Sequence, residues 1–189
     1  YLCGLRQNQT DRSNVAGQHA GTSDQGDLVL RLTVYSADPS VPPQQPPDIP
    51  LSAGGFSQLS GILDLYGFSS GYVKVERISG TAPYYAYGVI NDQGNSDGSF
   101  IPPLPADSLV GVSGLTLPVI VETGAFQSEL VLTNFSGTAK TLQLAYVAEG
   151  IESADSTARF SIPLEAGQQM ILPNLVQWLR TQGVAGIGP

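Results

Sequence analysis

The chain has 189 residues, of which 41% are hydrophobic and 13% charged, so it can bury a sizeable core and is expected to fold. Sixteen Asp and Glu against eight Lys and Arg give a net charge of −8, which argues against nucleic acid and anionic membranes as partners. The longest apolar runs, such as Leu117–Val121, are too short for a membrane helix, so we expect no membrane insertion.

Strand signals dominate the first half of the chain. Leu28–Tyr35 alternates apolar residues, and the four expected to face the core are Leu28, Leu30, Leu32 and Val34. Tyr72–Ile78 also alternates, with Val73 and Val75 toward the core, and the aromatic segment Pro83–Ile90 follows after a turn.

Part of the sequence is written twice. IPLSAGGFSQL at 49–59 returns as IPLEAGQQMIL at 162–172, and Leu30–Tyr35 and the segment from Ser13 have similar partners from Leu142 and Ser128. The three offsets are 113, 112 and 115 residues in the same order, and such small differences fall naturally in turns. The pattern predicts two copies of one β module.

Each repeated phrase is followed by a helical signal. In the second copy the apolar residues at helical spacing are Leu172, Leu175, Val176 and Leu179, with Pro173 expected in the first turn and Gly183 at the end. In the first copy a shorter turn is expected, with Ser60 as its cap and Gly67 as its stop.

These signals predict an all-β fold of two tandem, related antiparallel β-sandwich modules, each with a short helix or helical turn at one end. The expected boundaries are residues 1–101 for the first module, 102–114 for a Pro-rich linker and 115–189 for the second module. The second module is expected to be truncated, because the counterpart of 72–90 would lie beyond residue 189.

Several segments carry a family resemblance: Gly4–Asn8 to Arg12–Asn14, Leu51–Phe56, Gly71–Glu76, and Tyr87–Asp92 through Asp97–Phe100. Together they resemble a tandem β module of large secreted or surface proteins from environmental bacteria. The resemblance covers nearly the whole chain and implies an extracellular or cell-surface location. Its motifs are turn and core residues, so it implies no chemistry.

No arrangement of residues predicts catalysis. His19 is the only histidine, without a second metal ligand at useful spacing, and is interpreted as a polar residue at a strand end. Cys3, the only cysteine, excludes an intrachain disulfide and is expected to be a buried structural thiol.

The run from Asn91 to Gly98 offers the one candidate metal site. Asp92, Asn95 and Asp97 supply the hard oxygen ligands that Ca²⁺ prefers, although they are also ordinary turn formers and their spacing departs from the calcium-loop pattern. A second acidic loop, Glu149–Asp155, is a weaker candidate of the same kind. Calcium is therefore the only cofactor considered.

The candidate ligand-binding residues are Tyr85 and Tyr87, which alternation places on one face of a strand. Exposed tyrosine rings can form a platform for sugar rings, whereas packing within the sheet is the alternative explanation for them.

The preferred function is a non-enzymatic structural or adhesive repeat segment of an exported bacterial protein, because duplicating a module multiplies length or valency. Its expected partners are other modules of the parent protein, or further copies joined through open strand edges. The alternative is a carbohydrate-binding accessory module that uses the tyrosine platform to bind polysaccharide.

Overall fold

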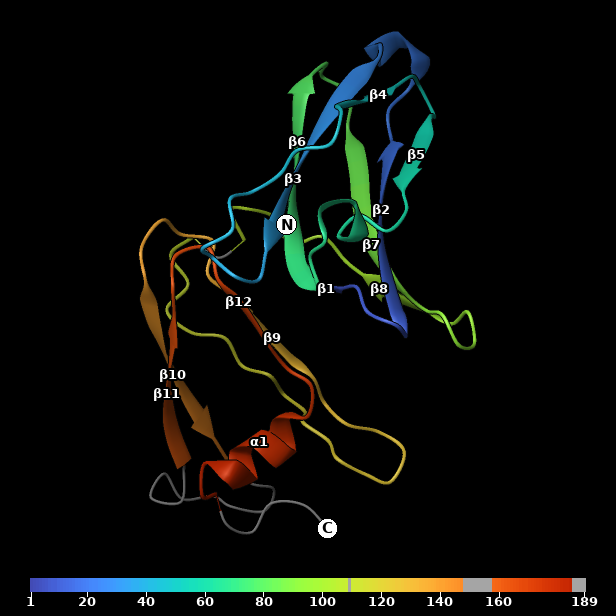
Figure 1. Ribbon diagram of the computed structural model, residues 1–189. Helices are drawn as coiled ribbons and strands as arrows, with labels where there is room; N and C mark the ends of the chain where they lie inside the picture. The colour runs from blue at the N-terminus through green and yellow to red at the C-terminus, as the bar shows by residue number, and fades with distance from the viewer. Residues whose placement is uncertain (109, 148–157, 185–189) are drawn as a thin grey trace. The chain divides into compact units, whose positions relative to one another are not determined.

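The computed structural model describes residues 1–108, 110–147 and 158–184 of the chain. The chain divides into two compact units, Tyr1–Val110 (unit 1) and Gly111–Pro189 (unit 2), and the division falls within the segment 102–114 that the sequence suggests as a linker (Figure 1). Among the described residues, the strands of both units pair antiparallel, and one short α-helix accompanies them. The prediction of an all-β fold is confirmed.

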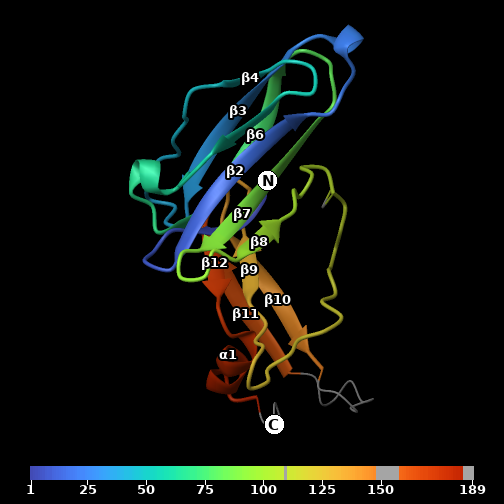
Figure 2. The same ribbon diagram turned by 90° about the vertical axis from the view of Figure 1, so that its right-hand side faces the viewer.

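Unit 1 consists of two four-stranded antiparallel sheets. The first sheet has the order β1 (Leu2–Arg6), β6 (Ser70–Ser79), β3 (Leu28–Ser36) and β4 (Ile49–Leu51). The second has the order β5 (Phe56–Leu59), β2 (Asp11–His19), β7 (Tyr84–Asp92) and β8 (Gly98–Ile101). Figure 1 shows the sheets as two layers, and Figure 2 looks onto the outer face of the second one.

The core of unit 1 lies between these two sheets. All four residues of the predicted core face of β3 are at most 1% exposed. The sheets approach closely at Gly17 on β2, where a Cβ atom would stand 2.7 Å from Leu30 Cδ1 of the other sheet. Since each sheet contributes alternate residues to one shared core, unit 1 is a β-sandwich.

Both faces of β6 carry a buried residue near the start of the strand. Val73 faces the core as predicted, but Tyr72, which alternation assigns to the opposite face, is also buried, at 2% exposure. Its ring stacks on that of Tyr35, its cross-strand partner on β3, with centroids 4.6 Å apart. The burial of Tyr72 raises the pKa of its hydroxyl.

Unit 2 has two two-stranded antiparallel sheets among its described residues. One pairs β10 (Lys140–Tyr146) with β11 (Ala158–Leu164), and the other pairs β9 (Leu130–Thr133) with β12 (Gln169–Leu172). Helix α1 (Leu175–Thr181) follows, and its buried residues join both sheets in a second core.

Both predicted helical segments are present, but each begins at a different residue from the one expected. Pro173 was expected in the first turn, but α1 begins two residues later, at Leu175. The Asn174 side chain caps the helix by accepting a hydrogen bond from the Gln177 backbone N–H. In unit 1 the equivalent turn is a 3₁₀-helix, η2 (Asp64–Tyr66), whose N-cap is Leu63 rather than Ser60.

Two glycines end these helical segments as expected. Gly67 adopts a left-handed conformation with φ of 68°, and Gly183 has φ of 85°.

A further 3₁₀-helix, η1 (Ser23–Gln25), lies in unit 1. Within the described residues, no helix has the length and apolar character needed to cross a bilayer.

Candidate functional site

An exposed row of aromatic rings lies on the outer face of the second sheet of unit 1. Tyr85 and Tyr87 are on this face of β7, and their ring centroids are 6.2 Å apart. Phe100 on β8 lies 5.5 Å from Tyr87 by the same measure and is 55% exposed. The predicted pairing of the two tyrosines on one face is thus found, with a third ring beside them.

The cross-strand register extends this row to a fourth ring. Gln18 on β2 pairs with Tyr85 on one side and with Phe56 of β5 on the other, so all three side chains share the outer face. Phe56 is 53% exposed. We call Phe56, Tyr85, Tyr87 and Phe100 the aromatic strip.

The neighbouring residues of β7 explain why the strip is on the surface. Tyr84 and Ala86 alternate with the strip residues and point inward, where Tyr84 packs against the core of unit 1. The two outward tyrosines therefore cover no part of that core. Near the end of the same strand, the buried Oδ1 atom of Asn91 has no hydrogen-bond partner among the described residues.

The candidate calcium ligands lie in the β7–β8 loop. Asp92 Oδ1 accepts a hydrogen bond from the Gly94 N–H at 2.7 Å, and Asn95 Oδ1 accepts one from the Asp97 N–H at 2.7 Å. The Asp97 carboxylate accepts one from the Gly98 N–H. All three side chains therefore act within the turn itself.

The described residues contain no cluster of ionisable side chains that could hold a cation. No group of three or more His, Cys, Asp or Glu side chains in this part of the chain is placed to hold a metal ion. The second acidic candidate, Glu149–Asp155, lies outside the described residues.

His19 is a structural residue at the end of β2. Its side chain is 2% exposed; Nδ1 accepts a hydrogen bond from the Gly21 N–H at 3.1 Å, and Nε2 lies 2.9 Å from the Gly26 carbonyl oxygen. Because Nδ1 accepts, the proton of the neutral ring is on Nε2, which donates to that carbonyl. Cys3, expected to be a buried thiol, is partly exposed on β1.

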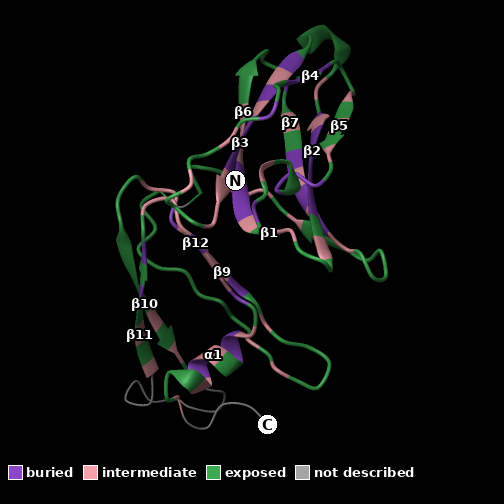
Figure 3. Cartoon of the chain, viewed as in Figure 1, coloured by how far each residue is buried: buried purple, intermediate pink, exposed green. Residues whose placement is uncertain are grey.

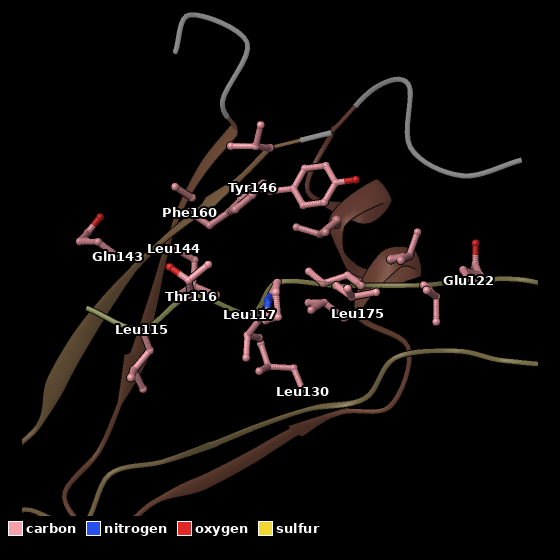
Figure 4. A pocket seen from close by; sticks show the side chains of 18 of the residues that line it. Leu115, Thr116, Leu117, Glu122, Leu130, Gln143, Leu144, Tyr146, Phe160 and Leu175 are labelled. Atoms are coloured by element: carbon pink, nitrogen blue, oxygen red, sulfur yellow. The ribbon is translucent and has the colours of Figure 1, made fainter. Parts of the chain in front are cut away.

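Unit 2 contains a second candidate surface, an open groove of about 1270 Å³ (Figure 4). One wall is the segment 115–123, another is β10, and helix α1 closes one end. The lining is mostly apolar and includes Leu117, Leu130, Leu144, Tyr146 and Leu175. Figure 3 shows how little of β10 and β11 is buried.

Side chains from both ends of α1 bind Glu122 in the segment before β9. Arg180 on the helix contacts Glu122, and the Asn174 side-chain amide donates to Glu122 Oε1 at 2.7 Å. The hydrogen bond from Arg180, followed by that from Asn174, lowers the pKa of the Glu122 carboxyl.

No protein-family model, no curated protein and no solved structure matches this chain. The geometry of the aromatic strip and of the groove is therefore the basis for a function.

Sequence reasoning identified half of the aromatic strip. Phe56 and Phe100 were missed because they join the tyrosines only through the strand order of the sheet. One signal could have indicated Phe56. It alternates with Ser57 and so shares a face with Gln58, next to a β2 strand whose outward residues are short or polar and leave the ring uncovered.

Proposed function

We propose that the chain is a non-enzymatic structural or adhesive segment of an exported protein, built from two copies of one β module. The observation that carries the proposal is the register of the strands within each unit. Residues matched by the sequence repeat occupy matched places in the hydrogen-bonded ladders, pair by pair.

The repeated Ile-Pro-Leu phrase pairs in the same way in both units. In unit 1, Leu30 of β3 lies opposite Ile49 of β4. In unit 2, Leu142 of β10 lies opposite Ile162 of β11, which is the pair that the offsets of 112 and 113 residues predict. A slip of one residue would turn every side chain of the strand to the other face, so this agreement is restrictive.

The second pair of strands agrees as well. Val15 of β2 lies opposite Leu59 of β5, and their matched residues Leu130 and Leu172 lie opposite each other on β9 and β12. In both units, a backbone hydrogen bond also joins the segment at the repeated serine to the helical segment. The Ile62 N–H donates to the Ser13 carbonyl and the Leu175 N–H to the Ser128 carbonyl, each at 2.9 Å.

Polar side chains repeat where they hold the backbone. The Arg6 N–H donates to Ser13 Oγ at 2.8 Å, and the Val121 N–H donates to Ser128 Oγ at 2.9 Å. Asn134 takes the place of His19: its Oδ1 accepts from the Ser136 N–H at 3.1 Å, just as the histidine Nδ1 accepts from Gly21.

What the two units share is thus a scaffold of register, caps and turns. Repeating a scaffold adds length or valency to a protein, whereas a repeated reaction site would require its polar groups to recur. The aromatic strip is not part of that scaffold, since its Phe56 is matched by Gln169 in the repeated phrase of unit 2. A spacing or presenting role at the cell surface is the function that fits.

Stretching single molecules between handles at the two ends tests this role. Independent modules are expected to unfold in two separate steps, and the release of unit 1 should lengthen the chain by roughly 300–400 Å at about 3.5 Å per residue. One cooperative step for the whole chain would contradict a modular spacer.

The aromatic strip favours a second function, binding of polysaccharide to unit 1. Adjacent rings on the outer face of this sheet offer apolar faces to sugar rings. The strip contributes nothing to the core that would otherwise explain it.

Affinity electrophoresis in soluble polysaccharides tests this second function. Tyr85→Ala, Tyr87→Ala and Phe100→Ala are expected to weaken retardation about tenfold each, since each removes one stacking face. Phe126→Ala removes an exposed ring from unit 2 and serves as the matched control. Equal retardation of all four variants would exclude the strip as the binding surface.

A further inference from the structure

We propose that the groove of unit 2 receives a β-hairpin from a separate polypeptide segment, with strands patterned like β6 and β7 of unit 1. This inference rests on the proposed function, because it treats the two units as copies. It names what unit 2 binds.

The groove lies where β6 runs in unit 1. There, β6 pairs with β1 on one side and with β3 on the other. The offsets of the repeat match β1 to the groove wall at 117–121 and β3 to the opposite wall, β10. Unit 2 therefore contains both neighbours of such a strand, with a groove between them.

The groove is lined by counterparts of buried core residues. Ile120, Leu130 and Leu144 line it, and their matches Leu5, Val15 and Leu32 are at most 2% exposed in unit 1.

Side chains on both walls of the groove are much more exposed than their counterparts in unit 1. Leu117 is 56% exposed, whereas its match Leu2 is fully buried, and Leu142 is 37% exposed, whereas Leu30 is fully buried. In unit 1 the strand that covers this surface is β6, whose Val73 lies fully buried in the core.

The strand edges of unit 2 also favour a β-hairpin as the occupant of the groove. Among the described residues, β10 pairs only with β11 and β9 only with β12, so each has one edge without a strand. Their matches in unit 1, β3 and β2, use that second edge for β6 and β7. An added hairpin would extend both sheets at once and bury the apolar lining.

The register of the docked hairpin follows from unit 1. Val75 of β6 lies opposite Leu32 of β3, so the equivalent residue of the hairpin lies opposite Leu144 of β10. The neighbouring position, equivalent to Lys74, points to the other face of the sheet.

A synthetic peptide of residues 69–93 serves as the probe, added to the full chain labelled for NMR. Saturable shift changes are expected along 115–123 and on β9 and β10. Val119→Asp, on an exposed position of the groove wall, is expected to weaken binding at least about tenfold by placing a charge in the interface. Val110→Asp is the matched control outside the groove, at similar exposure, and should leave binding unchanged.

Cross-linking tests the register. In a Cys3→Ser background, Leu144→Cys should form a disulfide with a Val75→Cys peptide and not with a Lys74→Cys peptide. Absence of binding, equal binding by Val119→Asp, or shifts confined to unit 1 would each overturn the inference. So would a concentration-dependent dimer that occupies the groove before peptide is added. If stretching gives two steps but the peptide does not bind, the docking inference fails and the modular role stands.

Discussion

Ser13 and Ser128 make related contacts in differently covered units, so their removal should have different consequences. Ser13 is fully buried, and its hydroxyl both accepts from the Arg6 N–H and donates to the Arg6 carbonyl, at 2.8 and 2.7 Å. Ser13→Ala removes two buried hydrogen bonds and should destabilise unit 1 by about 2–3 kcal/mol. Ser128→Ala removes the bond from Val121 at a half-exposed site, where water can replace it, and should cost about 0.5–1 kcal/mol.

Urea denaturation separates the two effects within one chain. Trp178 is the only tryptophan and reports unit 2 by fluorescence, whereas near-ultraviolet circular dichroism of the stacked Tyr35 and Tyr72 reports unit 1. The Ser13 variant should move the tyrosine transition alone, and the Ser128 variant should move the tryptophan transition slightly. Equal losses in both units, or no loss on removing Ser13, would refute the reasoning from burial.

Three further outcomes are expected. Gly71→Ala should abolish cooperative unfolding of unit 1, because the new Cβ would stand 2.0 Å from the Tyr35 carbonyl oxygen; calorimetry checks this, and an unchanged transition would contradict the close approach. His19→Ala should destabilise unit 1 by about 1–2 kcal/mol, because the Gly21 N–H loses its acceptor. His19→Asn should retain most of this stability, since asparagine keeps an acceptor for the same N–H. Equal urea midpoints for the two variants would contradict this reasoning. Glu122 has a folded-state pKa below its usual 4.5, so its contribution is present above that pH and is lost as the pH falls through the lowered value; Glu122→Gln should remove this part of the acid sensitivity of Trp178 fluorescence.

The sequence predicts best where the structure depends on local patterns. The core face of β3 could be predicted because alternation places every second residue of a strand on one side. Gly67 and Gly183 were predictable for a similar reason, since a helix end in a left-handed conformation favours glycine.

Features that need a distant partner escaped prediction. Tyr72 is buried because Tyr35, on a strand brought alongside by the fold, covers its outer face. Phe56 and Phe100 reach the aromatic strip only through the order β5-β2-β7-β8. The cap at Leu63 differs from the expected Ser60, and α1 begins after Asn174 rather than at Pro173, because packing decides where a short helical turn begins.

The shared register of the two units is the claim from which both proposals follow, and interstrand nuclear Overhauser effects in the full chain measure it directly. In unit 2, the expected pattern places Leu130 opposite Leu172 and Leu142 opposite Ile162. The matching pairs in unit 1 are Val15 with Leu59 and Leu30 with Ile49. A shift of one residue in either pair of unit 2 would turn its apolar side chains to the opposite face and contradict the account.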